Sequence, residues 1–314
     1  MTVLWGSGIL LGSAILSFIT VGISIALAKR YSWYDHPDGE RKLQVRPIPK
    51  LGGLAVAVAF TVTVCGILLA LGRGDDALLA MGVLGPALAA ALLGSVDDYR
   101  HLNPWLRLVL QAGLAMVAWI LGTRIDLFHN TLIDGTVFVV WVVLIVNGIN
   151  LLDNSDGLAG SSVLIAAVGA TVIAVTYGQI LVSSLGIALI GVSVGFLLFN
   201  WHPARVYLGD GGAYFLGFLL ALLTVRVRPE LVDEWQGVVV AALLVALPLV
   251  DTTFVTITRL RRGDHPFTAG RDHLSHLVQA RGVSVPKSVL VLDLAYLVCV
   301  ALGVLIAILP RVLA

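Results

Sequence analysis

Polar side chains that could do chemistry gather in four short segments of an otherwise apolar chain. Each segment borders a long apolar run: SVDDYRHLNP (95–104), NGINLLDNSDGLAG (147–160), NWHPARVYLGDGG (200–212) and RLRRGDHPFTAGRDHLSHL (259–277). Carboxylate and amide oxygens are the ligands that Mg²⁺ prefers, and guanidinium groups bind phosphate oxygens in pairs. The combination indicates chemistry on phosphate groups, assisted by a divalent cation.

The first segment carries two adjacent acids, Asp97 and Asp98, at the end of an apolar run. Arg107 and Gln111 follow on one face of the next expected helix. A carboxylate in the middle of a bilayer costs about 2.5 to 3.5 kcal/mol, so we expect this pair at the membrane interface or beside a cation. For the pair alone, solvated acids that cap a helix are the simpler interpretation. The recurrence of polar residues at three more helix ends favours a site.

In the second segment, Asn147, Asn150 and Asp153 recur at three-residue steps, and Asp156 follows. On a helix this spacing places the first three side chains along one stripe, where their oxygens could converge on a single ion or ligand. Asn residues in membrane helices also hydrogen bond to neighbouring helices, which is the alternative interpretation. That alternative does not explain the acids.

Asp210 lies among glycines in the third segment, directly before an expected helix. Glycine allows another group to approach the backbone closely, and a helix N-terminus favours an anion. GDGG alone could be an ordinary turn. Together with the acids of the other segments, it predicts a cradle for a metal ion and a diphosphate.

Basic residues dominate the fourth segment, which contains Arg259, Arg261, Arg262, Arg271, His273 and His276. A basic loop beside anionic lipid often only sets topology. The two histidines, three residues apart, favour phosphate binding instead. Two further acids lie inside apolar runs. Asp251 could face a cytoplasmic cavity, and we expect Asp293 to be structural.

The whole chain has the composition of a membrane protein. It is 58% hydrophobic and 12% charged, with a mean hydropathy of +0.97, and this charge content is about half that of a soluble domain. Apolar runs of about 17 to 25 residues can cross the hydrocarbon core as helices. We expect about ten such helices, near residues 3–28, 51–72, 77–96, 105–122, 136–152, 161–177, 179–200, 212–225, 236–258 and 288–309.

The distribution of basic residues sets the expected orientation. With these spans, the four polar segments and the loop at 29–50 share one side, which holds every Lys and Arg residue other than Arg73, Arg124, Arg226, Arg228 and Arg311. Basic residues favour the cytoplasmic side. The sequence therefore predicts an all-α, multi-pass helix bundle of one domain (1–314) in the plasma membrane. Its active site would be on the cytoplasmic face, and both termini would be extracytoplasmic.

Together the segments resemble the polyprenyl-phosphate N-acetylhexosamine-1-phosphate transferase family over nearly the whole chain. Five collinear motifs carry the resemblance: RKLQVRPIPKLGG (41–53), DDYRHLNPWLRLVLQ (97–111), NGINLLDNSDGLAG (147–160), PARVYLGDGG (203–212) and PLVDTTFVTITRLRRGDHPFTAGRDHLSHL (248–277). The first four are similar to family segments of the form RK-x-H-x2-P-x-PR-x-GG, DD-x8-[KR]-x3-Q, N-x2-N-x2-D-x2-DG-L and PA-x3-x-GD-x-G. The fifth is similar to the family's final cytoplasmic segment.

Within that family, the sequence is more similar to the N-acetylglucosamine-1-phosphate branch, which starts O-antigen, teichoic acid or related glycans. The peptidoglycan branch acts on UDP-N-acetylmuramoyl-pentapeptide and usually carries a run of histidines in the last loop, whereas residues 273–276 read HLSH. Four positions depart from the family pattern, namely Gln44 for His, Lys50 for Arg, Asn154 for Gly and Ser275 for His.

The resemblance implies an enzyme that moves a sugar-1-phosphate, with N-acetylglucosamine-1-phosphate favoured, from a UDP-sugar to a polyprenyl phosphate and releases UMP. It implies Mg²⁺, with Mn²⁺ as an alternative, held by Asp210 and Asn150. The catalytic residues would be Asp97, Asp98, Arg107 and Asp153. Three sets of residues would bind the substrates. Asp156 would accept a hydrogen bond from uracil, and Tyr207 would stack on the uracil ring. Arg271, His273 and His276 would hold the diphosphate and the sugar.

The UDP-N-acetylmuramoyl-pentapeptide transferases of peptidoglycan synthesis are the alternative within the family. From other classes, a cation-coupled transporter would carry its ionisable groups near mid-span, and a CDP-alcohol phosphotransferase would show a downstream pattern that this chain lacks. A non-enzymatic scaffold would not need these polar clusters on one face. We expect no nucleic-acid partner. The sequence does not decide whether the lipid attacks directly or through a phospho-Asp intermediate. It also leaves open the length of the lipid, the pathway that the enzyme feeds and whether the protein forms a homodimer.

Overall fold

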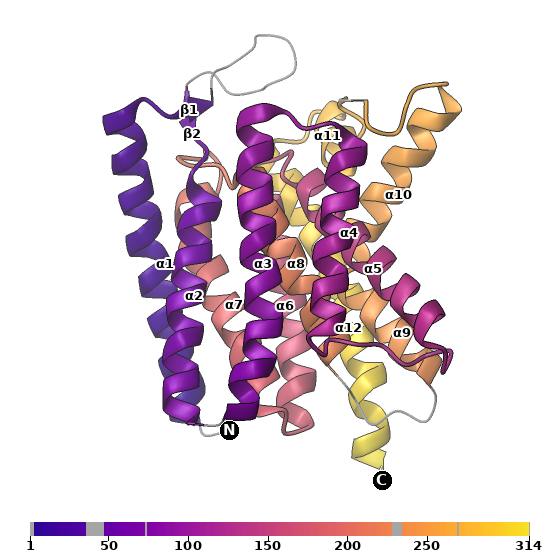
Figure 1. Cartoon of the computed structure of the whole chain (residues 1–314). Helices are drawn as coiled ribbons and strands as arrows, with labels where there is room; N and C mark the ends of the chain where they lie inside the picture. Colours follow the sequence, from indigo (N-terminus) through magenta and orange to yellow (C-terminus); the bar gives the residue numbers. More distant parts are fainter. Residues whose placement is uncertain (1–2, 36–46, 73, 228–233, 269, 314) are drawn as a thin grey trace.

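Helices make up nearly all of the regular structure in this computed structural model, which describes residues 3–35, 47–72, 74–227, 234–268 and 270–313 (Figure 1). Gln44 and residues 41–46 of the early motif lie outside the described residues. The helices are α1 (Val3–Tyr31), α2 (Gly52–Leu71), α3 (Gly74–Arg100), α4 (Pro104–Ile120), α5 (Thr131–Leu152), α6 (Leu158–Thr176), α7 (Ile180–Asn200), α8 (Gly209–Arg226), α9 (Glu234–Leu244), α10 (Ala246–Arg261), α11 (Leu274–Ala280) and α12 (Val285–Leu313).

Seven of the described helices are long and apolar enough to cross a membrane, namely α1, α2, α3, α5, α6, α7 and α12. The number rises to eight if α9 and α10, which meet at a 76° bend, count as one span. Helix α4 is apolar but shorter, and α8 carries charged residues at both ends. The chain is therefore an all-α, multi-pass membrane protein, while the expected number of ten spans remains a prediction.

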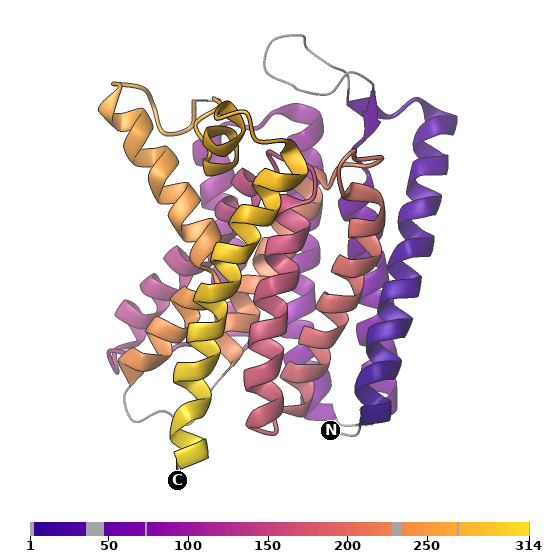
Figure 2. The ribbon, with the colours of Figure 1, turned by 180° about the vertical axis from the view of Figure 1, so that it is seen from behind.

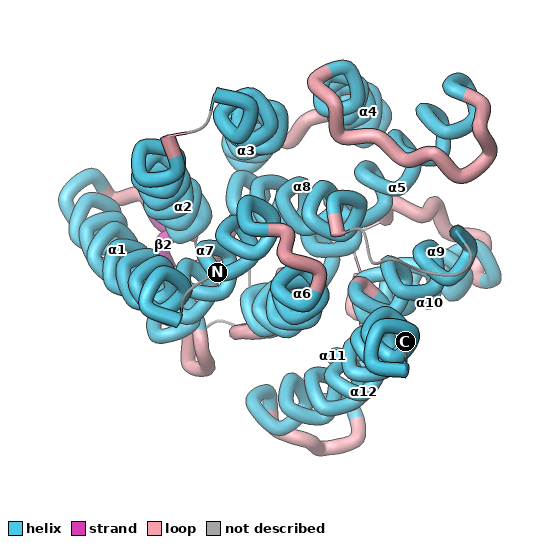
Figure 3. The backbone as a smooth tube through the Cα atoms, turned by 90° about the horizontal axis from the view of Figure 1, so that it is seen from below, coloured by secondary structure: helices cyan, strands magenta, loops and turns pink. Residues whose placement is uncertain are grey.

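Helix α8 lies at the centre of the bundle, where α2, α3, α5 and α6 pack around it (Figure 3). Nearly all of its residues are buried. A Cβ atom at Gly212 would overlap the backbone of Gly53 in α2, and one at Gly211 would lie 2.5 Å from the Ser95 hydroxyl in α3. Close contact between small residues drives helix association where lipid removes the hydrophobic effect. The close backbone approach that GDGG allows is therefore used here for helix packing.

Outward-facing side chains on the flanking helices are large and apolar. They include Leu11, Ile15 and Phe18 of α1 and Leu297 and Leu302 of α12, all largely exposed. An apolar surface of this extent suits lipid rather than water. The long axis of the bundle is therefore the direction in which it crosses the membrane.

The two ends of the bundle differ in character. The start of α1 and the end of α12 lie at one end, and the strands β1 (Tyr34–Asp35) and β2 (Ile48–Pro49), the α3–α4 turn and α11 lie at the other (Figures 1 and 2). The predicted site residues therefore gather at the end opposite the termini. Which leaflet this end faces remains a prediction from the basic residues.

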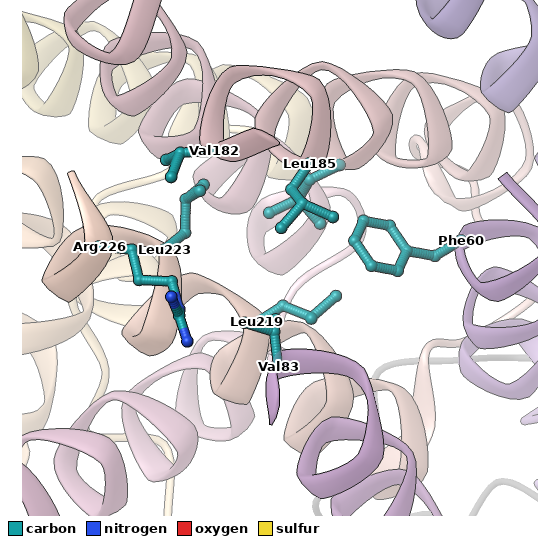
Figure 4. A pocket seen from close by; sticks show the side chains of 8 residues that line it. Phe60, Val83, Val182, Leu185, Leu219, Leu223 and Arg226 are labelled. Atoms are coloured by element: carbon teal, nitrogen blue, oxygen red, sulfur yellow. The ribbon is translucent and has the colours of Figure 1, made fainter. Parts of the chain in front are cut away.

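A small apolar pocket lies among α2, α3, α7 and α8 (Figure 4). Phe60, Val83, Leu185 and Leu219 line it, together with Arg226. Because Arg226 ends α8 and Asp210 lies in its first turn, this pocket lies away from the site described below. Its Arg226 side chain donates to the Thr123 hydroxyl (2.6 Å), which ties α8 to the end of α4.

Replacing Gly53 with Ala should destabilise the protein, because the added methyl group overlaps the Gly212 backbone. Overpacking of this kind costs about 1 to 3 kcal/mol. Thermal unfolding in detergent would measure the effect, with Gly66→Ala in the same helix as control, since a Cβ at Gly66 meets nothing within 4 Å. Equal melting temperatures for the two variants would contradict the packing described here.

Candidate active site

Backbone hydrogen bonds between two distant segments assemble the polar end of the bundle. The Tyr207 N–H donates to the Pro49 carbonyl (2.8 Å), the Gly52 N–H to the Tyr207 carbonyl (3.1 Å), and the Gly53 N–H to the Leu208 carbonyl (3.0 Å). These bonds hold β2 and the start of α2 against the residues that lead into α8. The early PIPKLGG segment and the GDGG segment therefore form one wall of the site.

Three carboxylates meet at the N-terminus of α8. Asp98 comes from the last turn of α3, Asp153 directly follows α5, and Asp210 belongs to α8 itself. The Gly211 N–H donates to Asp98 Oδ2 (3.2 Å), and the Asn150 Nδ2 donates to Asp210 Oδ1 (2.7 Å). Unpaired N–H groups and the positive end of the helix dipole favour anions at such a terminus. In this structure the start of α8 binds the protein's own carboxylates, Asp98 through the Gly211 N–H and Asp153 through the Gly209 backbone.

The three carboxylates repel one another. Burial raises the pKa of Asp153 well above its ordinary value, and the negative charges of Asp210 and Asp98 raise it further. A hydrogen bond from the Gly209 backbone and the positive charge of Lys50 oppose this rise. A negative charge on Asp153 is therefore costly at this place, and a proton or a divalent cation would relieve that cost.

Lys50 places a positive charge beside this cluster. Its Nζ lies 3.1 Å from Asp35 Oδ1 and 3.7 Å from Asp98 Oδ1, and 40% of the side chain is exposed. Burial lowers the pKa of Lys50, but the attraction of Asp35 and Asp98 outweighs burial and raises the pKa above its ordinary value. Sequence reasoning noted Lys50 only as a departure from a family pattern. The pairing of β1 with β2 brings Asp35 close to Lys50, and this pairing could not be predicted from the early motif alone.

The donor set suits Mg²⁺ bound in part by substrate. Carboxylate oxygens of Asp210 and Asp98 are the right type of ligand, while Asn150 turns its amide nitrogen to Asp210 and leaves its amide oxygen as a ligand. Within the described ranges, no group of three or more His, Cys, Asp or Glu side chains could hold a metal ion. Mg²⁺ commonly uses one or two carboxylates, with water and substrate phosphates completing its shell. The residues present therefore fit a Mg²⁺ that arrives with a phosphate substrate.

Asp97 lies in a buried hydrogen-bond network of its own. Its Oδ2 accepts from Arg107 Nη1 (3.0 Å) and from the Tyr214 hydroxyl (2.7 Å), and its Oδ1 accepts from the Leu102 N–H (2.8 Å). Only 3% of Asp97 is exposed. These contacts tie the α3–α4 turn to α4 and α8. They favour a positioning role for Asp97 and leave Asp98 as the acid that faces the other carboxylates.

Asn147 turns away from the three carboxylates. Its Nδ2 donates to Gln111 Oε1 (2.6 Å) and to the Val143 carbonyl (2.8 Å). Both asparagines thus make interhelical hydrogen bonds, Asn147 to Gln111 of α4 and Asn150 to Asp210 of α8, but only the bond of Asn150 reaches an acid of the cluster. In the described part of the chain, neither Gln111 Nε2 nor Arg107 Nε has a hydrogen-bond partner. Two buried donors, one turn apart on α4, remain available to an acceptor.

Asp156 fixes the loop that leads into α8. Its Oδ2 lies 2.7 Å from His202 Nδ1 and accepts from the Ala204 N–H (3.0 Å). Tyr207 follows in the same loop. Burial raises the pKa of Tyr207, and the negative charges of Asp156, Asp35 and Asp153 raise it further, so its hydroxyl stays protonated. The predicted nucleotide-binding pair therefore lies on the same wall as Lys50.

Asp251 and His273 order the last polar segment. His273 Nδ1 lies 2.8 Å from Asp251 Oδ2, and the Leu274 N–H donates to Asp251 Oδ1 (2.8 Å). Asp251 is 1% exposed, so the suggestion that it faces a cytoplasmic cavity is wrong. Since the acid accepts both bonds at the start of α11, it fixes the orientation of the His273 ring.

His276 packs against His273, with ring centroids 5.4 Å apart. Burial lowers the pKa of His276, and the positive charges of His273 and Arg271 lower it further. Its Nδ1 has no hydrogen-bond partner among the described residues. His276 is therefore a neutral imidazole near pH 7, with one ring nitrogen available.

Arg259 and Arg262 are bound within their own loop by Asp272. Arg259 Nε lies 3.1 Å and Arg262 Nη2 lies 2.7 Å from its two carboxylate oxygens. Burial raises the pKa of Asp272, but the two arginine hydrogen bonds outweigh burial and lower it below its ordinary value. These two guanidinium groups shape the loop that carries Arg271 and His273.

Two departures from the family pattern contact each other. The Ser275 hydroxyl donates to Asn154 Oδ1 (2.5 Å), and Asn154 Nδ2 donates to the Leu151 carbonyl (2.6 Å). The pair joins α11 to the loop between α5 and α6. Sequence reasoning considered the two substitutions separately, because nothing local indicates a contact between residues so far apart in the chain.

Comparisons with known proteins identify the family of this chain. Residues 80–228, which include Asp97, Asp98, Asp153 and Asp210, match the family described as Glycosyl transferase family 4. A Bacillus subtilis (strain 168) protein named "Probable undecaprenyl-phosphate N-acetylglucosaminyl 1-phosphate transferase" is 30% identical over 293 residues, which cover 89% of this chain and 80% of the relative.

Two further relatives represent both branches considered above. The "Decaprenyl-phosphate N-acetylglucosaminephosphotransferase" of Mycolicibacterium smegmatis is 28% identical over 90% of this chain and 78% of the relative. The "Phospho-N-acetylmuramoyl-pentapeptide-transferase" of Streptococcus mutans serotype c is 27% identical over 73% of each chain.

A membrane helix bundle with acids and bases gathered at one end defines the class of integral-membrane enzymes that act on phosphate groups. Within that class, the chain belongs to glycosyl transferase family 4 and to its polyprenyl-phosphate N-acetylhexosamine-1-phosphate transferases.

The different surroundings of Asp97 and Asp98 predict different consequences of losing each side chain. Asp97→Ala leaves Arg107 and Tyr214 without their buried partner, and breaking a buried ion pair costs about 3 to 5 kcal/mol. Asp98→Ala removes one of several repelling charges and should leave the stability close to that of the wild type. Thermal unfolding in detergent compares the two variants, and a larger loss of stability for Asp98→Ala would refute this assignment.

Proposed function

We propose that this protein transfers N-acetylglucosamine-1-phosphate from UDP-N-acetylglucosamine to a polyprenyl phosphate at the cytoplasmic face of the plasma membrane, releasing UMP. The observation that carries the proposal is the meeting of Asp98, Asp153 and Asp210 at the polar end of a membrane-spanning bundle. The relatives named as N-acetylglucosamine-phosphate transferases support the choice of reaction.

The reaction joins two strongly negative molecules. An oxygen of the lipid phosphate attacks the phosphorus bonded to the sugar, a new P–O bond forms, and the P–O bond to UMP breaks, so that UMP leaves with the negative charge. When bound, Mg²⁺ would neutralise charge on the diphosphate. Asp210 and Asp98 would hold the ion, with the Asn150 amide nitrogen keeping Asp210 in place.

Residues around the cluster can serve the two substrates. Asp98 lies at the edge of the cluster beside Lys50, where it would orient the lipid phosphate through the bound ion. Arg107 has an unpartnered Nε that can donate to a phosphate oxygen while its Nη1 stays on Asp97. Tyr207 and Asp156 share one wall and suit the nucleotide. His276 has an unpartnered Nδ1 that can accept from a sugar hydroxyl, since its other ring nitrogen is hydrogen bonded to the Asn154 backbone.

Direct attack by the lipid phosphate and a phospho-Asp intermediate place different demands on Asp98. As a nucleophile it must reach phosphorus, whereas as an orienting group it must stay close to the lipid phosphate. Its Oδ2 accepts from the Gly211 N–H (3.2 Å), while its Oδ1 lies 3.7 Å from Lys50 Nζ, beyond hydrogen-bonding distance. This geometry is compatible with both pathways.

An assay of UMP release tests the proposed function. Purified protein with Mg²⁺, UDP-N-acetylglucosamine and undecaprenyl phosphate should release UMP, and EDTA should stop the release until Mg²⁺ is restored. Asp210→Ala should lower the rate by about a hundredfold or more, because it removes an electrostatic group from the reacting centre. Asp126→Ala, an exposed acid in the loop between α4 and α5, is the matched control. An active Asp210→Ala variant would overturn the assignment.

The donor sugar is tested by direct competition. We expect UDP-N-acetylglucosamine to be used at least about tenfold more efficiently than UDP-N-acetylmuramoyl-pentapeptide, since a well-placed polar contact gives discrimination of this order or more. The expectation depends on Ser275, which is engaged with Asn154 where the peptidoglycan branch usually has histidine. Comparison of kcat/KM for the two donors decides it, and preference for the peptide donor would move the protein to the other branch.

A further inference from the structure

Lys50 has a fixed backbone beside the carboxylate cluster. The Pro49 carbonyl, just before Lys50, accepts from the Tyr207 N–H. After Lys50, the N–H groups of Gly52 and Gly53 donate to carbonyls of the residues that lead into α8. Its own carbonyl lies 2.9 Å from the position that a Cβ of Gly209 would occupy. Since the backbone is held on both sides, the only freedom left at this position is in the four-carbon stem of the side chain.

The Lys50 ammonium is held firmly by one acid and loosely by another. Nζ lies 3.1 Å from Asp35 Oδ1, which is hydrogen-bonding distance, but 3.7 Å from Asp98 Oδ1, which is beyond it. An ammonium group has three N–H donors. Asp35 anchors the group with one of them, and 40% of the side chain remains exposed. Lys50 can therefore accept a further anion without leaving Asp35.

Among the described basic side chains near the site, Arg259 and Arg262 are bound by Asp272, and Arg107 is paired with Asp97 through Nη1 but keeps an unpartnered Nε. Each substrate of the reaction brings phosphate groups to a place that already holds three carboxylates. Such a substrate requires a cation at the edge of the cluster that still has N–H donors available.

From this geometry we infer that Lys50 binds a phosphate oxygen of a substrate, with Asp35 holding its ammonium in place. The inference rests on the proposed function for the identity of the ligand, which is either the polyprenyl phosphate or the diphosphate of the nucleotide. A purely structural counter-ion would instead leave the affinity for both ligands unchanged when it is removed. The two ligands can be tested separately.

Equilibrium binding to the full-length protein in nanodiscs distinguishes these cases. Two probes are titrated in separate arms, UDP in the presence of Mg²⁺ and undecaprenyl phosphate. Lys50→Met should weaken binding in at least one arm by about ten- to a hundredfold, the usual effect of losing a charged hydrogen bond. Lys50→Arg should keep most of the affinity. Lys287→Met, an exposed lysine in the first turn of α12, is the matched control and should change neither arm.

Each outcome decides the inference. Weaker binding in the UDP arm assigns Lys50 to the donor, and weaker binding in the undecaprenyl phosphate arm assigns it to the acceptor. Unchanged affinity in both arms overturns the inference. If Lys50→Met lowers the yield of folded protein, Lys50→Gln removes the charge with a polar side chain and carries the same comparison. Intact binding without UMP release by the wild type would contradict the proposed function but not the role of Lys50.

Discussion

Repulsion among the carboxylates at the start of α8 is the constraint on which the rest of this structure depends. Asp98, Asp153 and Asp210 come from three different helix ends, and burial makes each unneutralised charge costly. The protein balances part of this charge with the α8 backbone N–H groups, the Asn150 amide and Lys50. In the proposed reaction, a cation bound here would neutralise the remaining charge and, through its own charge, bring the phosphates of the two substrates together.

Such a cluster can exist only if helix packing forces the acids together. Helix α8 is surrounded by α2, α3, α5 and α6, and its contacts with α2 and α3 run through Gly212 and Gly211. Backbone bonds between residues 49–53 and 207–208 then attach the early loop to the same helix end. The glycines of GDGG and of KLGG thus serve chemistry indirectly, since they set how closely the charged helix ends approach.

Much of this arrangement could be predicted from the sequence, because acids and bases at the ends of apolar runs must lie near one membrane surface. The sequence could not separate Asp97 from Asp98, since adjacent helical residues point about 100° apart and only packing decides which faces α8. Likewise, the contacts of Lys50 with Asp35 and of Ser275 with Asn154 are tertiary. Hydropathy also cannot tell α8, which is surrounded by protein, from a helix that faces lipid. For that reason the number of spans is harder to predict than the site.

The most direct test of the central claim is the binding of Mn²⁺, a paramagnetic substitute for Mg²⁺, to purified protein measured by electron paramagnetic resonance. The account predicts that UDP strengthens Mn²⁺ binding and that Asp210→Asn or Asp98→Asn weakens it strongly, while Asp126→Asn at the other end of the bundle has no effect. Mn²⁺ binding that is unchanged in both Asp210→Asn and Asp98→Asn would show that the carboxylates at the start of α8 do not hold the ion, and would contradict the account.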